Sequence, residues 1–248
     1  MKKRNAVRIG FAVVMFVLVI ASYSSAALIN EMVVLDRSYV AALVLSNQPD
    51  KPAEAVTASM KRLTESWKKF VDGLSPADRE NNALKNAIPD IGGSVAEAQK
   101  LAAAGKRREA HEALETVRLT FWKARSNMGI EYLPDKLTAF HEPMEEFVDL
   151  AEKPNADKTR LAKLLDELSA KWKMVEDSPL DTRLFGFNDE KVQRYTTLVK
   201  KERETISSLS DLLKGSDQAA FAKTAGMVKS NFSQTYMIFG DFSGLGLN

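Results

Sequence analysis

The feature that most constrains this chain is a match of the chain to itself at an offset of about 105 residues. Four short segments recur in the same order, namely 46–50 with 151–155, 63–67 with 168–172, 75–78 with 178–181 and 117–121 with 228–232. A repeat of this kind indicates how a chain divides into structural units. It predicts two units, residues 27–139 and 140–248, each the size of a small domain.

The apolar residues of each unit recur with a helical period. The predicted stripes are Val56, Met60, Leu63, Trp67 and Phe70 in the first unit, and Leu161, Leu165, Leu168, Trp172 and Val175 in the second. Steps of three and four place these side chains on one face of a helix. No segment of useful length alternates with a period of two, so strands are not expected. The expected fold is therefore all-α, with two tandem four-helix up-and-down bundles produced by an internal duplication.

Proline and glycine mark the expected ends of these helices. Ser75-Pro76 and Ser178-Pro179 each predict a helix start, with the serine as the N-cap. Pro89 is expected to kink or break the third helix of the first unit. Pro143 is expected to begin a short first helix of the second unit. The glycine-rich tail, residues 239–248, should either fray or dock through Phe242.

Residues 1–26 have the pattern of a secretory signal peptide. Lysine and arginine near the start precede an uncharged run over residues 9–21, and the small residues Ser24 and Ala26 precede a cleavage site. The run is shorter than the roughly 20 residues of a membrane helix. Cleavage is therefore favoured, while an uncleaved inner-membrane anchor through residues 9–28 remains the alternative. Both place the body of the protein in the periplasm, because the basic residues stay inside.

Composition excludes several classes of protein. The chain has no Cys, which excludes thiol nucleophiles, cysteine-ligated zinc, iron–sulfur clusters and covalently attached haem. Without residues 1–26 the body has 31 Lys and Arg against 33 Asp and Glu, a net charge near −2. A nucleic-acid-binding protein needs a basic face. We therefore expect no nucleic-acid partner.

Residues 95–121 read VAEAQKLAAAGKRREAHEALETVRLTF. This alanine-rich helical hairpin resembles the cytochrome b562 family of periplasmic four-helix bundles. The resemblance implies a haem held by an axial methionine and an axial histidine. Those two positions fall on Met60 and Arg125 in the first unit, and on Leu165 and Thr235 or Tyr236 in the second. Because neither unit has the histidine and arginine keeps its proton, no cofactor is expected.

The two histidines occur in matching motifs, His-Glu-x-x-Glu. A metalloprotease motif has a second histidine where this chain has Glu115 after His111 and Glu145 after His141. A histidine and a glutamate four residues apart on a helix can share a metal ion, so these four residues are weak metal candidates. The preferred interpretation is that both histidines are solvated or cap helices, with His111 on the surface. A specific transition-metal site needs three or four strong ligands.

No motif in the chain indicates an enzyme. It has neither a glycine-rich phosphate loop nor a Gly-x-Ser-x-Gly elbow. Trp122, beside Phe121, and Tyr132 are candidate contacts for a partner, although packing between the bundles is the simpler role for Trp122. The junction near residues 132–145 is the expected groove, because ligand sites favour domain interfaces.

The sequence thus predicts an exported, non-enzymatic protein that binds an unidentified protein or small ligand in the periplasm. The alternative is a haem-binding or metal-handling protein related to cytochrome b562, which could transfer electrons.

Overall fold

The computed structural model describes residues 26–247, and within this range the chain forms helices joined by turns, with no strand. The all-α prediction is confirmed. The helices are residues 26–46, α2 (Ala53–Gly73), α3 (Pro76–Glu80), α4 (Asn82–Ala103), α5 (Arg107–Asn127), α6 (Leu133–Ala151), α7 (Lys158–Glu176), α8 (Thr182–Phe185), α9 (Asp189–Lys214) and α10 (Gln218–Met237). Among these residues, no helix is both long and apolar enough to cross a membrane. The predicted leader lies outside the described residues except for Ala26.

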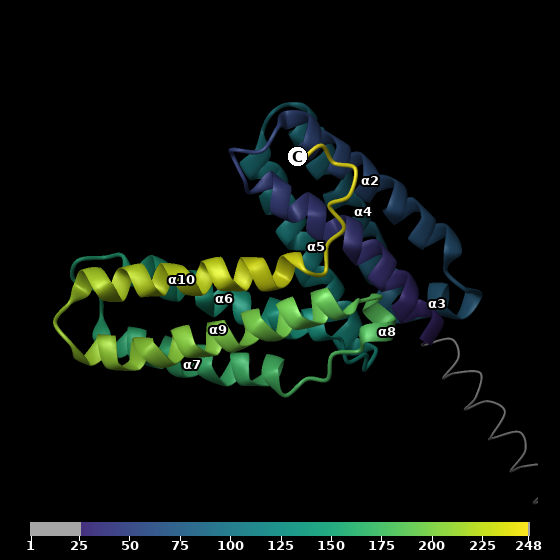
Figure 1. Cartoon of the computed structure of the whole chain (residues 1–248). Coiled ribbons are helices and arrows are strands. Elements are labelled where there is room, and N and C mark those ends of the chain that lie inside the picture. Colours follow the sequence, from purple (N-terminus) through teal and green to yellow (C-terminus); the bar gives the residue numbers. More distant parts are fainter. Residues whose placement is uncertain (1–25, 248) are drawn as a thin grey trace, which may run out of the picture.

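The helices form two groups whose long axes are inclined to one another (Figure 1). The first bundle contains residues 26–46, α2, α4 and α5, and the second contains α6, α7, α9 and α10. Each helix of the second bundle contacts two others, which closes a ring of four. The short helices α3 and α8 precede α4 and α9, so one order of long and short helices occurs twice. That order agrees with the predicted repeat, while the duplication itself stays a prediction.

The predicted apolar stripes form the two cores, with one departure. Trp172 is buried and donates from Nε1 to the carbonyl of Val199 at 3.0 Å. Its counterpart Trp67 is only half-buried, at the edge of its core, where its ring lies 5.7 Å from that of Phe70. Gly92 leaves room for this indole, because a Cβ there would lie 3.2 Å from Trp67 Nε1. The equivalent tryptophans therefore pack differently.

The predicted helix start at Pro143 is wrong, and of the two outcomes expected at Pro89 the break does not occur. Helix α6 begins at Leu133 and continues through Pro143, which is buried. The proline at its start is Pro134, in the first turn, where the amide that proline lacks would have no helical partner. Helix α4 likewise continues through Pro89. Packing of an apolar face stabilises such helices more than local propensity does. Because α6 begins at Leu133, the predicted division between residues 139 and 140 falls inside this helix.

The two predicted serine caps behave differently. Ser75 is the N-cap of α3, and its hydroxyl accepts from the amide of Asp78 at 3.2 Å, as predicted. In the second unit the cap is Asp181, which accepts from the amides of Arg183 and Leu184. The prediction for Ser178 is wrong, because the helix starts three residues later at a carboxylate, which is an equally good cap.

After α10 the chain leaves the second bundle and crosses onto the first (Figure 1). The amide of Asp241 donates to the carbonyl of Arg37 at 2.9 Å. The guanidinium of Arg62 donates to the carbonyls of Asp241 at 3.2 Å and Ser243 at 2.7 Å. Arg37 in turn donates to the carbonyl of Phe185 in α8, at 2.9 Å. The tail therefore ties the two bundles together with hydrogen bonds at several points.

Apolar side chains anchor this tail as well. Phe239 and Leu245 are buried, and Phe242 is partly buried against the same core. The Phe239 ring lies 5.0 Å from that of Phe185 in an edge-on arrangement. Of the two predicted behaviours of the tail, docking is therefore correct and fraying is wrong. The deepest anchors are Phe239 and Leu245 rather than Phe242.

We expect Phe239→Ala to lower the free energy of unfolding by about 3 kcal/mol, the usual cost of truncating a buried phenylalanine. Urea denaturation followed by circular dichroism measures this loss. Phe242→Ala is the matched control and should cost less than half as much, since that ring keeps contact with solvent. A loss below about 1 kcal/mol for Phe239→Ala would contradict the assigned role of the tail.

The core of the second bundle contains an acid. Glu202 of α9 is 0% exposed, and neither of its carboxylate oxygens has a hydrogen-bond partner among the described residues. Burial raises the pKa of Glu202 to about 8, against smaller opposing effects of Asn231 and Lys201. The carboxyl group is therefore protonated at neutral pH. Its proton is bound more tightly in the folded chain than in the unfolded chain, so folding stability falls as pH rises towards 8.

We expect Glu202→Gln to remove this pH dependence. The variant should match the wild type at pH 5, where Glu202 is neutral, and exceed it at pH 9 by about 1–3 kcal/mol, the cost of an unsatisfied buried group. Unfolding midpoints in urea at both pH values test this. Glu204→Gln, on the exposed face of the same helix, should leave the pH profile unchanged. Parallel profiles for wild type and Glu202→Gln would show that Glu202 does not titrate in this range.

Candidate functional site

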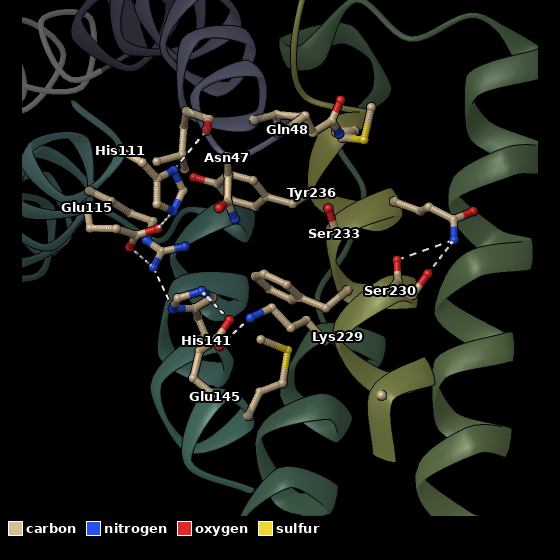
Figure 2. Close-up of a pocket in the computed structure, with 18 residues that line it drawn as sticks. Asn47, Gln48, His111, Glu115, His141, Glu145, Lys229, Ser230, Ser233 and Tyr236 are labelled. Carbon is tan, nitrogen blue, oxygen red and sulfur yellow. Dashed lines mark hydrogen bonds and ion pairs between the residues drawn. The ribbon is translucent and has the colours of Figure 1, made fainter. Parts of the chain in front are cut away.

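A cavity of about 470 Å³ lies where the two bundles meet (Figure 2). Its walls come from the end of helix 26–46 and from α5, which belong to the first bundle, and from α6 and α10, which belong to the second. The four weak metal candidates all line it. The two His-Glu motifs therefore belong to one pocket, although His111 and Glu145 are 34 residues apart in the sequence.

Helical spacing explains how these side chains reach the cavity. His111, Glu115 and Arg118 are four and three residues apart on α5, so they share one face of that helix. His141 and Glu145 are four residues apart on α6, and their Nε2 and Oε1 atoms are 3.3 Å apart. This geometry requires α6 to extend upstream of Pro143. The earlier start of α6, which the sequence analysis missed, is what brings His141 into the pocket.

His111 is more buried than the predicted surface side chain, with 19% of the side chain exposed. Helix 26–46 covers it, and its Nδ1 lies 3.0 Å from the carbonyl oxygen of Leu43. Its Nε2 lies 3.4 Å from Oε1 of Glu115. Desolvation lowers the pKa of His111, against the opposing effect of Glu115 and the Leu43 carbonyl. Both ring nitrogens therefore face acceptors, while burial favours the neutral ring.

Arg118 joins the two His-Glu pairs. Its side chain is buried, and Nη2 donates to Glu115 Oε2 and lies 2.6 Å from Nδ1 of His141. Because arginine only donates, Nδ1 of His141 must accept, so the proton of the neutral ring sits on Nε2, facing Glu145. A guanidinium in the wall of the pocket thus sets the tautomer of a histidine on the neighbouring bundle.

Glu145 ends this chain of contacts. Its Oε1 faces His141, and its Oε2 accepts from Nζ of Lys229 on α10 at 2.6 Å. Burial by itself raises the pKa of Glu145, but the hydrogen bonds from His141 and Lys229 outweigh burial and bring the pKa to about 2. Figure 2 shows Lys229 reaching across the cavity towards Glu145. The carboxylate is therefore ionised throughout the physiological range.

The arrangement does not fit a metal site. Between residues 26 and 247, no group of three or more histidine, aspartate or glutamate side chains lies close enough to hold a metal ion. Arg118 stands between the two His-Glu pairs, and its positive charge would repel a cation there. The lone pair of His141 Nδ1 is also committed to Arg118.

The positions that the family resemblance assigns to haem do not fit one. Arg125 is buried, and its Nε and Nη2 donate to the carboxylate of Asp135 at 2.6–3.1 Å. Its Nη1 lies 3.8 Å from Oδ2 of Asp36 on helix 26–46. Met60 lies in the core. An arginine enclosed by two carboxylates cannot act as an iron ligand, and in the second unit Thr235 and Tyr236 also lack an imidazole.

The two aromatic candidates differ in exposure. Tyr132 is buried, with its ring 4.6 Å from Cζ of Arg125 and 5.7 Å from the ring of Phe185. It packs inside the junction, where it also lines a second cavity with Glu131 and Phe185, and its contact with a partner stays a prediction. Trp122 is half-exposed beside buried Phe121, as the helical geometry predicts. Its role in binding a partner or packing between the bundles stays a prediction.

Sequence reasoning did not single out Arg118 and Lys229, although the repeat contained a signal for them. Val117-Arg118 matches Val228-Lys229, so the two cations of the pocket occupy equivalent positions of the two units. Each lies one residue after a buried valine and lines the cavity. A basic residue that follows a core valine at the same position of both units could therefore have indicated the site.

No protein-family model, no curated protein and no solved structure matches this chain. The resemblance to the cytochrome b562 family therefore stays a prediction. The pocket has to be interpreted from its own residues.

We expect Arg125→Leu to lower the free energy of unfolding by about 3–5 kcal/mol, because Asp36 and Asp135 would be left buried without their cation. Chemical denaturation of the purified protein measures this. Arg108→Leu removes an arginine from the exposed face of the same helix and should change stability by less than about 0.5 kcal/mol. Equal stabilities for the two variants would contradict the importance of the Arg125 ion pairs.

Proposed function

We propose that this protein is an exported, non-enzymatic binding protein whose ligand site is the cavity between the two bundles. The single observation that carries the proposal is a cavity of about 470 Å³ with charged side chains from both bundles in its wall. Sites for small ligands have volumes of about 300–1,000 Å³ and favour interfaces between domains. The signal-peptide pattern of residues 1–26 supports a periplasmic location.

The chemistry of the pocket supports binding rather than catalysis. A general base works best with a pKa near the working pH. Glu145, with a pKa of about 2, is too weak a base for this role, because His141 and Lys229 stabilise its charge. The accepting nitrogen of His141 is itself occupied by Arg118. The charged groups neutralise one another, an arrangement suited to holding a ligand in place.

The alternative, an electron-transfer or metal-handling protein related to cytochrome b562, has less support. It needs an axial histidine or a cluster of ligands. The candidate position for the first unit is Arg125, whose guanidinium is bound by Asp135. The two histidines of the chain lie in the pocket, one on each side of Arg118.

Native mass spectrometry of the protein recovered from its host periplasm tests the proposal. We expect a small bound molecule on the wild type that is lost from Ser233→Trp, because residue 233 lines the cavity and an indole would fill it. Ser210→Trp, on the exposed face of α9, is the matched control and should keep the molecule. The same spectrum reports whether residues 1–26 have been removed.

Two results would overturn the proposal. One is a bound molecule that Ser233→Trp retains, which would place binding elsewhere. The other is a haem or metal mass on the wild type, which would favour the alternative function.

A further inference from the structure

We infer that the cavity binds a small organic monocarboxylate, with the carboxylate held by Lys229 and Arg118 and an apolar body packed between the bundles. This inference rests on the proposed function and names the class of ligand.

The hydrogen-bond donors that remain available in the cavity favour an anion. Four basic side chains, His111, Arg118, His141 and Lys229, face two acidic ones, Glu115 and Glu145. All four carboxylate oxygens of the two glutamates already have a basic partner. The ammonium of Lys229 has three N–H groups, of which the contact with Glu145 uses one. The unused hydrogen-bonding capacity of the charged groups is therefore on the cations.

The two cations reach the cavity from different bundles. Arg118 comes from α5 of the first bundle, and Lys229 comes from α10 of the second. Arg118 is buried, with 4% of its surface exposed, whereas Lys229 lies at the exposed side. An acceptor group that bridges them would gain charge-assisted hydrogen bonds, which are stronger than neutral ones. It would also link the two bundles through the ligand.

The apolar side chains that line the cavity suit the apolar part of such a ligand. Leu43 and Val44 contribute aliphatic surface from the first bundle, and Met144, Phe232 and Met237 contribute apolar surface from the second. Phe232 stacks on Tyr236 with ring centroids 5.9 Å apart, which gives a firm aromatic wall. Small ligands are usually held by such apolar walls, with a few polar groups that fix their orientation.

Binding of an anion should be coupled to uptake of a proton at His111. With neutral histidines the charges of Arg118, Lys229 and the two glutamates cancel, so a carboxylate would leave one negative charge in excess. The groups that face His111 are the Leu43 carbonyl, the Ser46 hydroxyl, Glu115, Arg118 and His141. Acceptors at both ring nitrogens suit an imidazolium at His111. At His141, by contrast, Nδ1 faces the Arg118 guanidinium, which is a donor and not an acceptor.

Isothermal titration calorimetry with the purified protein tests the inference. The probes are phenylacetate and hexanoate, each compared with its uncharged amide, phenylacetamide or hexanamide. We expect the carboxylates to bind at least tenfold more tightly than the amides, since a hydrogen bond to a charged group contributes more than a neutral one. Lys229→Gln should weaken carboxylate binding at least tenfold. Lys223→Gln, on the exposed face of α10, should leave it unchanged.

The proton linkage has its own readout. Carboxylate affinity should be several-fold higher at pH 5.5 than at pH 7.5, and titrations in two buffers of different ionisation enthalpy should show net proton uptake. His111→Gln should bind with the same affinity at both pH values. A pH dependence that survives in His111→Gln would overturn the assignment of the proton to His111.

The outcomes separate this inference from the proposed function. Equal binding of carboxylates and amides, abolished by Ser233→Trp, would overturn the anion inference and leave the pocket as a binding site. A native molecule lost from Ser233→Trp, together with no carboxylate binding, would do the same. Carboxylate binding that neither Lys229→Gln nor Ser233→Trp weakens would place the anion outside this cavity. Absence of both carboxylate binding and a native molecule would count against both proposals.

Discussion

The ion pair between Arg125 and Asp135 is the interaction on which the arrangement of the two bundles depends. Arg125 is near the end of α5 and Asp135 is in the first turn of α6, so the pair fixes the turn between the bundles. Asp36 adds a second carboxylate from helix 26–46. A buried charge is costly to leave unpaired. The chain can therefore satisfy these three side chains only when the first helix, α5 and α6 converge.

The cavity follows from that convergence. Once α5 and α6 are joined at residues 125–135, the helical faces that carry His111 and His141 are brought opposite one another. Arg118 then bridges them, and Lys229 completes the wall from α10. The docked tail closes the junction from another side, so the pocket is supported by covalent, polar and apolar links between the bundles. The affinity for a ligand held between Arg118 and Lys229 would therefore depend on how the two bundles are placed relative to one another.

Much of the helical framework could be predicted from the sequence, because amphipathic periodicity depends only on neighbouring residues. The stripes that contain Leu63 and Leu168 are buried apart from half-buried Trp67. The sequence also indicated four residues of the pocket through its two His-Glu motifs. It could not show that they meet, since spacing along a helix gives no distance between helices. For the same reason His111 was assigned to the surface, whereas a helix more than 60 residues upstream covers it.

The sequence alone determined that this chain forms amphipathic helices without cysteine chemistry, since periodicity and composition are properties of the chain itself. Only the tertiary structure decided that Pro143 lies within a helix, that Tyr132 is buried and that the tail crosses to the other bundle. It also decided that Arg125 has two carboxylate neighbours. These outcomes depend on desolvation and on pairing between segments far apart in the sequence. The free energy of burying a charge or a ring is set by what surrounds it, and local pattern does not contain that information.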